Sequence, residues 1–175
     1  METDLLDKIR SIPDFPKKGI LFRDITTLLK DGRAFARVVD LLYEHYREAR
    51  VDKVASVESR GFIFGAALAY KLGAGFIPMR KPGKLPAETI REEYALEYGT
   101  DSIEVHRDAI VSGERILLLD DLLATGGTMA AACKLVRRLG GTIVGVAFII
   151  ELSFLGGRKV LHEKNIFTLL DYDSE

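Results

Sequence analysis

The sequence predicts a single α/β domain in which helices flank both faces of a mostly parallel, twisted sheet. Short apolar runs rich in β-branched residues alternate with segments that repeat at helical spacing, a pattern typical of parallel sheets. Glycine and proline mark the boundaries between these segments. The 175 residues are 47% hydrophobic, enough for one substantial core, and no repeat or Ser/Gly-rich linker divides them. We therefore treat residues 1–175 as one domain.

In the first half of the chain, the pattern predicts an amphipathic helix followed by a strand, a helix and a strand. Apolar side chains recur at helical spacing from Gly32 to about Glu48. A segment that is apolar on nearly every side stops at Gly73, as expected of a helix that covers a sheet. The predicted strand, helix and strand are residues 53–58, 62–72 and 75–79.

The middle of the chain departs from this alternation. A basic loop punctuated by glycine and proline, residues 80–86, leads into residues 93–105, where partial alternation predicts an extended hairpin. We expect residues 80–106 to form an exposed, flexible insertion. Beyond it the pattern predicts a strand, a helix that stops at Gly140, and a β-branched strand. These are residues 115–119, 128–139 and 142–150.

Composition and charge exclude several classes of protein. Lys+Arg number 25 and Asp+Glu 26, so the formal net charge of -1 attracts neither nucleic acid nor an anionic membrane. The acidic start is not followed by a signal core, and the longest apolar stretch, residues 143–150, is too short to span a bilayer. The single cysteine, Cys133, is expected in the core. These features predict a cytoplasmic protein.

Parallel sheets bind ligands at the carboxyl ends of their strands, and the strongest chemical signal lies at such an end. A buried strand runs into Asp120 and Asp121, and a glycine turn then opens a helix. Gly126 and Gly127 lack a Cβ, so their backbone can approach an anion closely, while free N–H groups and the helix dipole attract phosphate. The hydroxyls of the flanking threonines add donors.

Two acids beside a phosphate cradle are unfavourable unless they serve other ligand atoms, such as paired ribose hydroxyls or a hard cation. A sugar phosphate with a free diol meets both demands. The alternative is structural: the acids cap the turn and the glycines merely form it. The segment is neither a Walker loop, because no Gly-Lys-Ser/Thr follows the turn, nor a dinucleotide fingerprint, because Gly-x-Gly-x-x-Gly is absent.

The strand, acid pair and Thr-Gly-Gly turn of residues 116–128 resemble the PRPP-binding signature of the type I phosphoribosyltransferases. The resemblance implies that Asp120 and Asp121 hold the ribose hydroxyls, and that Mg²⁺ is held mainly through PRPP, close to both. The implied 5-phosphate-binding residues are Ala124, Thr125, Gly126, Gly127 and Thr128.

The N-terminal segment, residues 1–30, contains Pro13-Asp14-Phe15-Pro16 and an apolar run through Phe22. From the residues alone it is either a lid or a strapping strand. It resembles the hood of the adenine-specific branch of the family, in which Phe22 stacks on the base and the backbone of Leu21 and Arg23 reads its edge. By the same resemblance Leu152 lies on the opposite face of the base, although it could equally continue the core.

A further segment, Glu58-Ser59-Arg60-Gly61, follows a predicted central strand, where an exposed arginine beside a glycine can bind an anion. It resembles the family's pyrophosphate loop, which implies that Ser59 and Arg60 bind pyrophosphate. Many relatives carry alanine in place of Ser59.

The basic loop and the hairpin read as solvated surface on the residues alone. The resemblance implies that Arg80, Lys81 and Lys84 also bind pyrophosphate, with Arg80 acting across a dimer interface. Glu97 would manage the proton of the purine.

The implied activity is transfer of the phosphoribosyl group of PRPP to adenine, giving AMP and pyrophosphate. The implied catalytic residues are Glu97, Arg60, Asp120 and Asp121, in a homodimer. Two alternatives stay open: the same reaction on another base, such as hypoxanthine, xanthine or orotate, and a PRPP-binding regulator without turnover. The regulator is disfavoured because no residues remain for a DNA-binding module.

Overall fold

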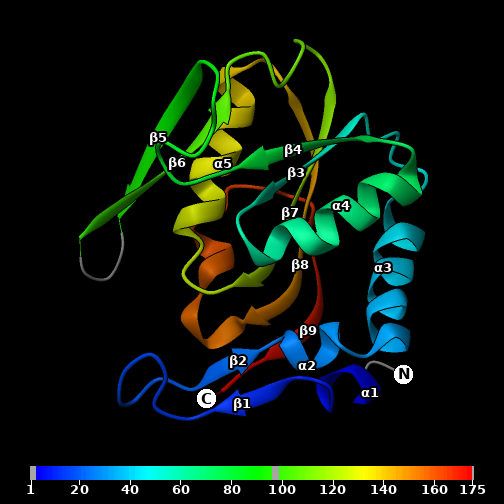
Figure 1. The fold of residues 1–175 in the computed structure, drawn as a ribbon, viewed down its shortest axis with the longest axis vertical. Coiled ribbons are helices and arrows are strands. Elements are labelled where there is room, and N and C mark those ends of the chain that lie inside the picture. The colour runs from blue at the N-terminus through cyan, green and yellow to red at the C-terminus, as the bar shows by residue number, and fades with distance from the viewer. Residues whose placement is uncertain (1–2, 96–98, 175) are drawn as a thin grey trace.

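The computed structural model describes residues 3–95 and 99–174, and its centre is a five-stranded, fully parallel sheet (Figure 1). The strand order is β4-β3-β7-β8-β9. The strands are β3 (Lys53–Val57), β4 (Gly75–Met79), β7 (Arg115–Leu123), β8 (Thr142–Leu152) and β9 (Ile166–Tyr172). The predicted α/β fold with a mostly parallel sheet is confirmed.

Helices cover both faces of this sheet, as predicted. α3 (Gly32–Tyr46) and α4 (Arg60–Leu72) lie on one face, and α5 (Gly127–Arg138) lies on the other (Figure 1). Alternate side chains of β7 enter two separate cores, because successive residues of a strand point to opposite faces. Leu117 packs with α3 and α4, whereas Leu118 packs with α5.

The helix boundaries follow from local chemistry. The Asp31 side chain accepts hydrogen bonds from the N–H groups of Arg33 and Ala34, both at 3.1 Å, which caps α3. Gly73 ends α4 in the left-handed conformation, with φ of 66°. α4 begins at Arg60, earlier than the pattern indicates.

One predicted boundary is wrong in a way that matters for the site. The strand expected to end at Leu119 continues to Leu123 and carries the acidic pair within it. Asp120 pairs with Phe148 of β8, and Leu122 pairs with Ile150, so the ladder persists beyond the apolar run. The apolar pattern of the sequence could not predict this extension, because it depends on hydrogen bonding between β7 and β8.

The insertion is an antiparallel hairpin, as predicted, formed by β5 (Thr89–Ala95) and β6 (Thr100–His106) against α5. It starts earlier than the expected residues 93–105, and Glu97 lies outside the described residues. Two short 3-10 helices follow β8: η1 (Ser153–Leu155) and η2 (Gly157–Lys159). Among the described residues, no helix has the length and apolar character to cross a membrane.

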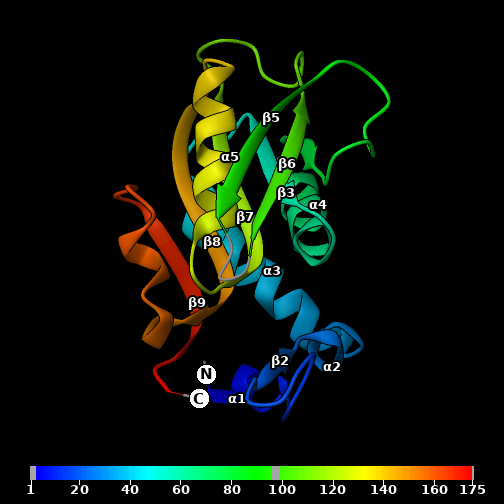
Figure 2. The same cartoon turned by 90° about the vertical axis from the view of Figure 1, so that its left-hand side faces the viewer.

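The N-terminal segment forms a small layer of its own. It consists of α1 (Thr3–Leu6), β1 (Arg10–Ile12), β2 (Phe22–Asp24) and α2 (Thr26–Leu29). β1 and β2 pair as an antiparallel hairpin. Figures 1 and 2 place this layer at the end of the molecule where β9 finishes, and therefore at the carboxyl end of the parallel sheet.

Candidate active site

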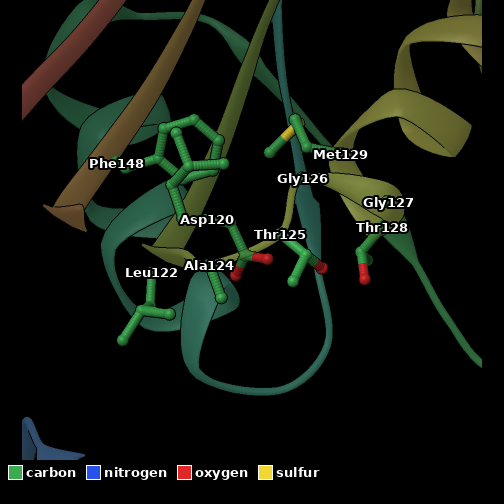
Figure 3. A pocket seen from close by; sticks show the side chains of 10 residues that line it. Asp120, Leu122, Ala124, Thr125, Gly126, Gly127, Thr128, Met129 and Phe148 are labelled. Carbon is green, nitrogen blue, oxygen red and sulfur yellow. The ribbon is translucent and has the colours of Figure 1, made fainter. Parts of the chain in front are cut away.

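A small cavity of about 90 Å³ lies where β7 turns into α5 (Figure 3). Asp120, Thr125 and Thr128 contribute side-chain oxygen atoms to its wall. Within the described residues no side chain caps the N-terminus of α5, so its first N–H groups can bind an anion. The cavity is lined by Asp120, Leu122, Leu123, Ala124, Thr125, Gly126, Gly127, Thr128, Met129 and Phe148. The structure thus brings together all five residues of the predicted phosphate loop.

Two glycines allow this loop to pack against the turn after β8. Gly126 has φ of +85°, and a Cβ there would lie 2.6 Å from the carbonyl oxygen of Gly157. A Cβ on Gly157 would lie 2.2 Å from the carbonyl oxygen of Ala124. Gly157 therefore allows the turn after β8 to pack directly against the backbone of the phosphate loop. Sequence reasoning assigned it no role, because nothing local shows which backbone it contacts.

The acidic pair is linked to the predicted pyrophosphate loop. The Nε atom of Arg60 lies 2.6 Å from Oδ2 of Asp121, which is only 6% exposed. Oδ1 of Asp120 accepts a hydrogen bond from the Asp121 N–H at 2.8 Å. A Cβ on Gly61 would come within 2.7 Å of the same oxygen, so a glycine at position 61 allows the start of α4 to lie this close to Asp120.

Burial controls the protonation of both acids. It raises the pKa of Asp120 well above its usual range, and the charge of the adjacent Asp121 adds to the rise. Burial also raises the pKa of Asp121, while the Arg60 guanidinium opposes it. A cationic ligand near Asp120 would favour its charged form, so this pair suits a cationic sugar or a metal ion.

The hood reaches the same site through Phe22. The guanidinium carbon of Arg60 lies 5.3 Å from the centroid of the Phe22 ring, and Phe15 packs edge-on against that ring at 5.1 Å. Leu21, just before β2, and Arg23 are half-buried. The N-terminal segment is thus placed over the carboxyl end of the sheet, as a lid would be.

Leu152 ends β8 at this same edge of the sheet. It is half-buried, packs against the core beside α3 and α4, and pairs with Tyr172 of β9. Leu152 therefore continues the core, and its predicted contact with the base stays a prediction.

Glu58 is a site residue that sequence reasoning missed. Its Oε2 lies 3.1 Å from both Arg80 Nη2 and Lys84 Nζ, and its Oε1 accepts a hydrogen bond from the Lys81 N–H at 2.5 Å. Burial raises the pKa of Glu58, but these hydrogen bonds from Lys81, Lys84 and Arg80 outweigh it and leave the pKa below its usual value. The peptide bond from Glu58 to the exposed Ser59 is cis. The sequence signal that could have identified Glu58 is its position as an acid at the end of a predicted central strand.

The basic loop is exposed, as expected, but its cations are not free. Lys81 Nζ pairs with Asp101 and donates to the Tyr94 hydroxyl at 3.0 Å. Because Arg80 and Lys84 pair with Glu58, all three cations of this loop that are predicted to bind pyrophosphate contact carboxylates of their own chain. The mobility of this loop stays a prediction, as does the role of Glu97.

None of the three histidines lines the phosphate cavity. His45 stacks on Phe167 at 3.8 Å, and burial lowers its pKa. His106 Nε2 is buried without a hydrogen-bond partner among the described residues, and His162 is exposed. Cys133 is buried, which raises its pKa to about 12 and makes it an inert core residue.

Comparison with known proteins agrees with this geometry. The family model described as the phosphoribosyl transferase domain matches residues 24–173, and the chain belongs to that family. It is 59% identical to the adenine phosphoribosyltransferase of Solibacter usitatus, over 97% of this chain and 98% of that protein. Within the family it groups with the adenine phosphoribosyltransferases.

Solved structures agree. The adenine phosphoribosyltransferase of Thermoanaerobacter pseudethanolicus has a TM-score of 0.95 and 52% identity, covering 98% of this chain and 100% of that one. The Saccharomyces cerevisiae enzyme, solved in complex with D-2,5-dideoxy-2,5-imino-altritol 1,6-bisphosphate and adenine, has a TM-score of 0.91 and 40% identity, covering 97% of this chain and 98% of that one.

Proposed function

We propose that this chain transfers the 5-phosphoribosyl group of PRPP to adenine and releases AMP and pyrophosphate. One observation carries the proposal. Arg60 contacts Asp121 beside the phosphate cavity and also lies against Phe22 of the hood, so the predicted phosphate, pyrophosphate and base regions meet around one side chain.

PRPP binding follows from the cavity. The 5-phosphate lies against the uncapped start of α5, where N–H groups and the hydroxyls of Thr125 and Thr128 bind its oxygens. Asp120 and Asp121 accept hydrogen bonds from the ribose hydroxyls. During the reaction the bond from the anomeric carbon to pyrophosphate breaks and a bond to a ring nitrogen of adenine forms. The two carboxylates stabilise the positive charge that develops on the ribose.

Pyrophosphate departure is assisted by Ser59, Arg60 and the basic loop. Arg80 and Lys84 now contact Glu58, so they exchange this carboxylate for pyrophosphate oxygens as PRPP binds. Lys81 exchanges Asp101 in the same way. By family resemblance Glu97 moves the proton of the purine, an effect of about two to four powers of ten in rate.

Magnesium fits this site as a partner of the substrate. Within residues 3–95 and 99–174, no group of three or more His, Cys, Asp or Glu side chains is placed to hold a metal ion. Mg²⁺ commonly takes one or two carboxylates together with substrate phosphates and waters, and Asp120 beside the phosphate loop supplies such a carboxylate. When bound through PRPP, it neutralises charge on the leaving pyrophosphate.

We also propose a cytoplasmic homodimer. The outer face of α4 supports it, because Ile63 and Tyr70 there are 42% and 90% exposed. In such a dimer Arg80 would also reach the partner's site, although it pairs here with Glu58 of its own chain. Sedimentation equilibrium would test the assembly, with Tyr70→Glu expected to shift it toward the monomer.

One assay separates the candidate functions. Pyrophosphate release from PRPP and Mg²⁺ is measured with adenine, hypoxanthine, xanthine and orotate. We expect release with adenine alone. Release with another base at comparable efficiency would reassign the substrate, and PRPP binding without release with any base would indicate a regulator.

A further inference from the structure

The hood has two parts, a base that is buried in the core and a hairpin that extends from it. Its base is anchored in the core, where Leu28 of α2 and the preceding Ile25 are fully buried. Phe22 and Arg23 lie in the β1–β2 hairpin, whose connecting loop extends away from α2 and α3 (Figure 1). Any position that the proposed function requires of Phe22 therefore depends on contacts that fix the hairpin itself.

One such contact joins the hood to the last strand of the protein. The guanidinium carbon of Arg23 lies 4.0 Å from the centroid of the Tyr172 ring, and its Nη1 donates to Ser11 Oγ at 2.6 Å. The Arg23 side chain thus connects both strands of the hairpin to β9. A cation over the face of an aromatic ring is attracted by the ring's electrons.

The Tyr172 ring is itself firmly placed. Tyr172 is the last residue of β9, pairs with Leu152 of β8 and packs, half-buried, against the core beside α3 and α4. Its carbonyl oxygen accepts a hydrogen bond from Ser153 Oγ at 3.3 Å. Tyr172 therefore contacts β2 and β8, the two elements that contain Phe22 and Leu152, which the family resemblance places on opposite faces of adenine.

We propose that Tyr172 is a positioning residue that fixes the hood over the base site by holding the Arg23 side chain. It acts through Arg23 and Leu152 rather than by touching the reacting atoms. The proposal rests on the proposed function, because it presumes that the hood binds adenine. Loss of the contact lets the hairpin move, so adenine binding weakens while PRPP binding, at the α5 cavity, does not.

The test compares Tyr172→Leu, Tyr172→Phe and Arg23→Met in the full chain. Tyr172→Leu removes the aromatic face, and Arg23→Met removes the charge while keeping the length of the side chain. We expect each to raise the KM for adenine roughly 3- to 10-fold, with the KM for PRPP within twofold of the unmodified protein. Tyr172→Phe keeps the ring and should restore the adenine KM.

The double variant decides whether the two residues act together. If they do, Tyr172→Leu combined with Arg23→Met raises the adenine KM no further than either change alone. An unchanged adenine KM in Tyr172→Leu, equal rises for both substrates, or additive effects in the double variant would each overturn the proposal.

Hydrogen exchange keeps the proposal separate from the assignment of adenine. In the substrate-free protein the amides of residues 22–24 should exchange faster in Tyr172→Leu and Arg23→Met than in Tyr172→Phe. If the unmodified protein fails to use adenine, the proposed function fails, yet this difference in exchange still tests whether the Arg23–Tyr172 contact holds the hairpin. Equal exchange in all three variants would contradict it.

Discussion

The Nε atom of Arg60 lies 2.6 Å from Oδ2 of Asp121, so the loop proposed to bind pyrophosphate and the strand proposed to bind ribose are joined by an ion pair. Asp121 is nearly buried, whereas the Arg60 side chain is 36% exposed and also lies near Phe22. This arrangement couples the parts of the site that bind the leaving group, the sugar and the base. It also identifies the acid whose neutralisation should be most costly.

We expect Asp121→Asn to lower kcat/KM by roughly 10- to 1,000-fold, and Asp120→Asn to lower it less. Either amide can still accept a hydrogen bond from a ribose hydroxyl, but it loses the charge that complements a cationic sugar, and Asp121→Asn also leaves Arg60 without its partner. Steady-state kinetics with adenine and PRPP would measure the loss, with circular dichroism as the control for folding. Normal activity in both variants would exclude the proposed role of the acids.

A second prediction concerns Glu58, which holds the basic loop. Glu58→Gln keeps an acceptor for the Lys81 N–H but removes the charge that attracts Arg80 and Lys84. Trypsin should therefore cut the substrate-free variant after Arg80 and Lys84 several times faster than the unmodified chain. PRPP with Mg²⁺ should slow the cutting in both proteins, because the loop closes on the ligand.

The matched control for this experiment is Glu88→Gln. Glu88 pairs with the exposed Arg107 at 3.6 Å, well outside the proposed site, so its loss should leave cleavage unchanged. Cleavage of Glu58→Gln at the unmodified rate would show that the carboxylate does not hold the loop. Cleavage unaffected by PRPP would indicate a passive surface loop.

The hood should show a pH-dependent stability that comes from Asp24. Hydrogen bonds from the Arg10 side chain, the Thr26 backbone N–H and the Thr26 hydroxyl lower the pKa of this buried carboxyl to about 2 from 3.8. Because the folded pKa lies below the unfolded one, the stabilisation is complete above the unfolded value and is lost as pH falls through the folded value.

Asp24→Asn should accordingly lower the free energy of unfolding at neutral pH by on the order of 1–2 kcal/mol, a figure discounted for the exposure of Arg10. Urea unfolding at a series of pH values would measure it. The difference between the two proteins should shrink as the pH falls from about 4 toward 2. A difference that stays constant over this interval would assign the effect to something other than the charge.

Base selection gives a fourth prediction: the chain should use adenine and reject hypoxanthine by on the order of a thousandfold or more. Adenine offers an amino donor beside a ring acceptor, which matches a backbone C=O of Leu21 and a backbone N–H of Arg23. Hypoxanthine inverts this pattern and leaves two buried polar groups unpaired, at about 1–3 kcal/mol each.

The side-chain variants separate reading from stacking. Arg23→Ala should keep the preference for adenine even though it weakens the hood contact, because the reading atoms belong to the main chain. Phe22→Ala should weaken binding of every base. The ratio of kcat/KM for the two bases is the measurement, and comparable values in the unmodified protein would remove the assignment of adenine while leaving that of PRPP.

Much of the fold and the phosphate loop could be predicted from the sequence because their determinants are contiguous. The helical spacing after Gly32, the stop at Gly73, and the strand, acids and glycine turn of residues 116–128 each lie within one or two elements. A local period dictates which face of an element is buried, and a glycine turn dictates where N–H groups are exposed. Such features need no knowledge of the rest of the chain.

The tertiary structure alone decided which of these pieces meet. Arg60 reaches Asp121 because β3 and β7 are neighbours in the order β4-β3-β7-β8-β9, which places the turn after β3 beside the end of β7. Gly157 supports the phosphate loop, and Tyr172 the hood, for the same reason: β8 and β9 end at that edge. Strand order depends on long-range packing and hydrogen bonding, so the periodicity of one segment does not predict which strands will lie beside it.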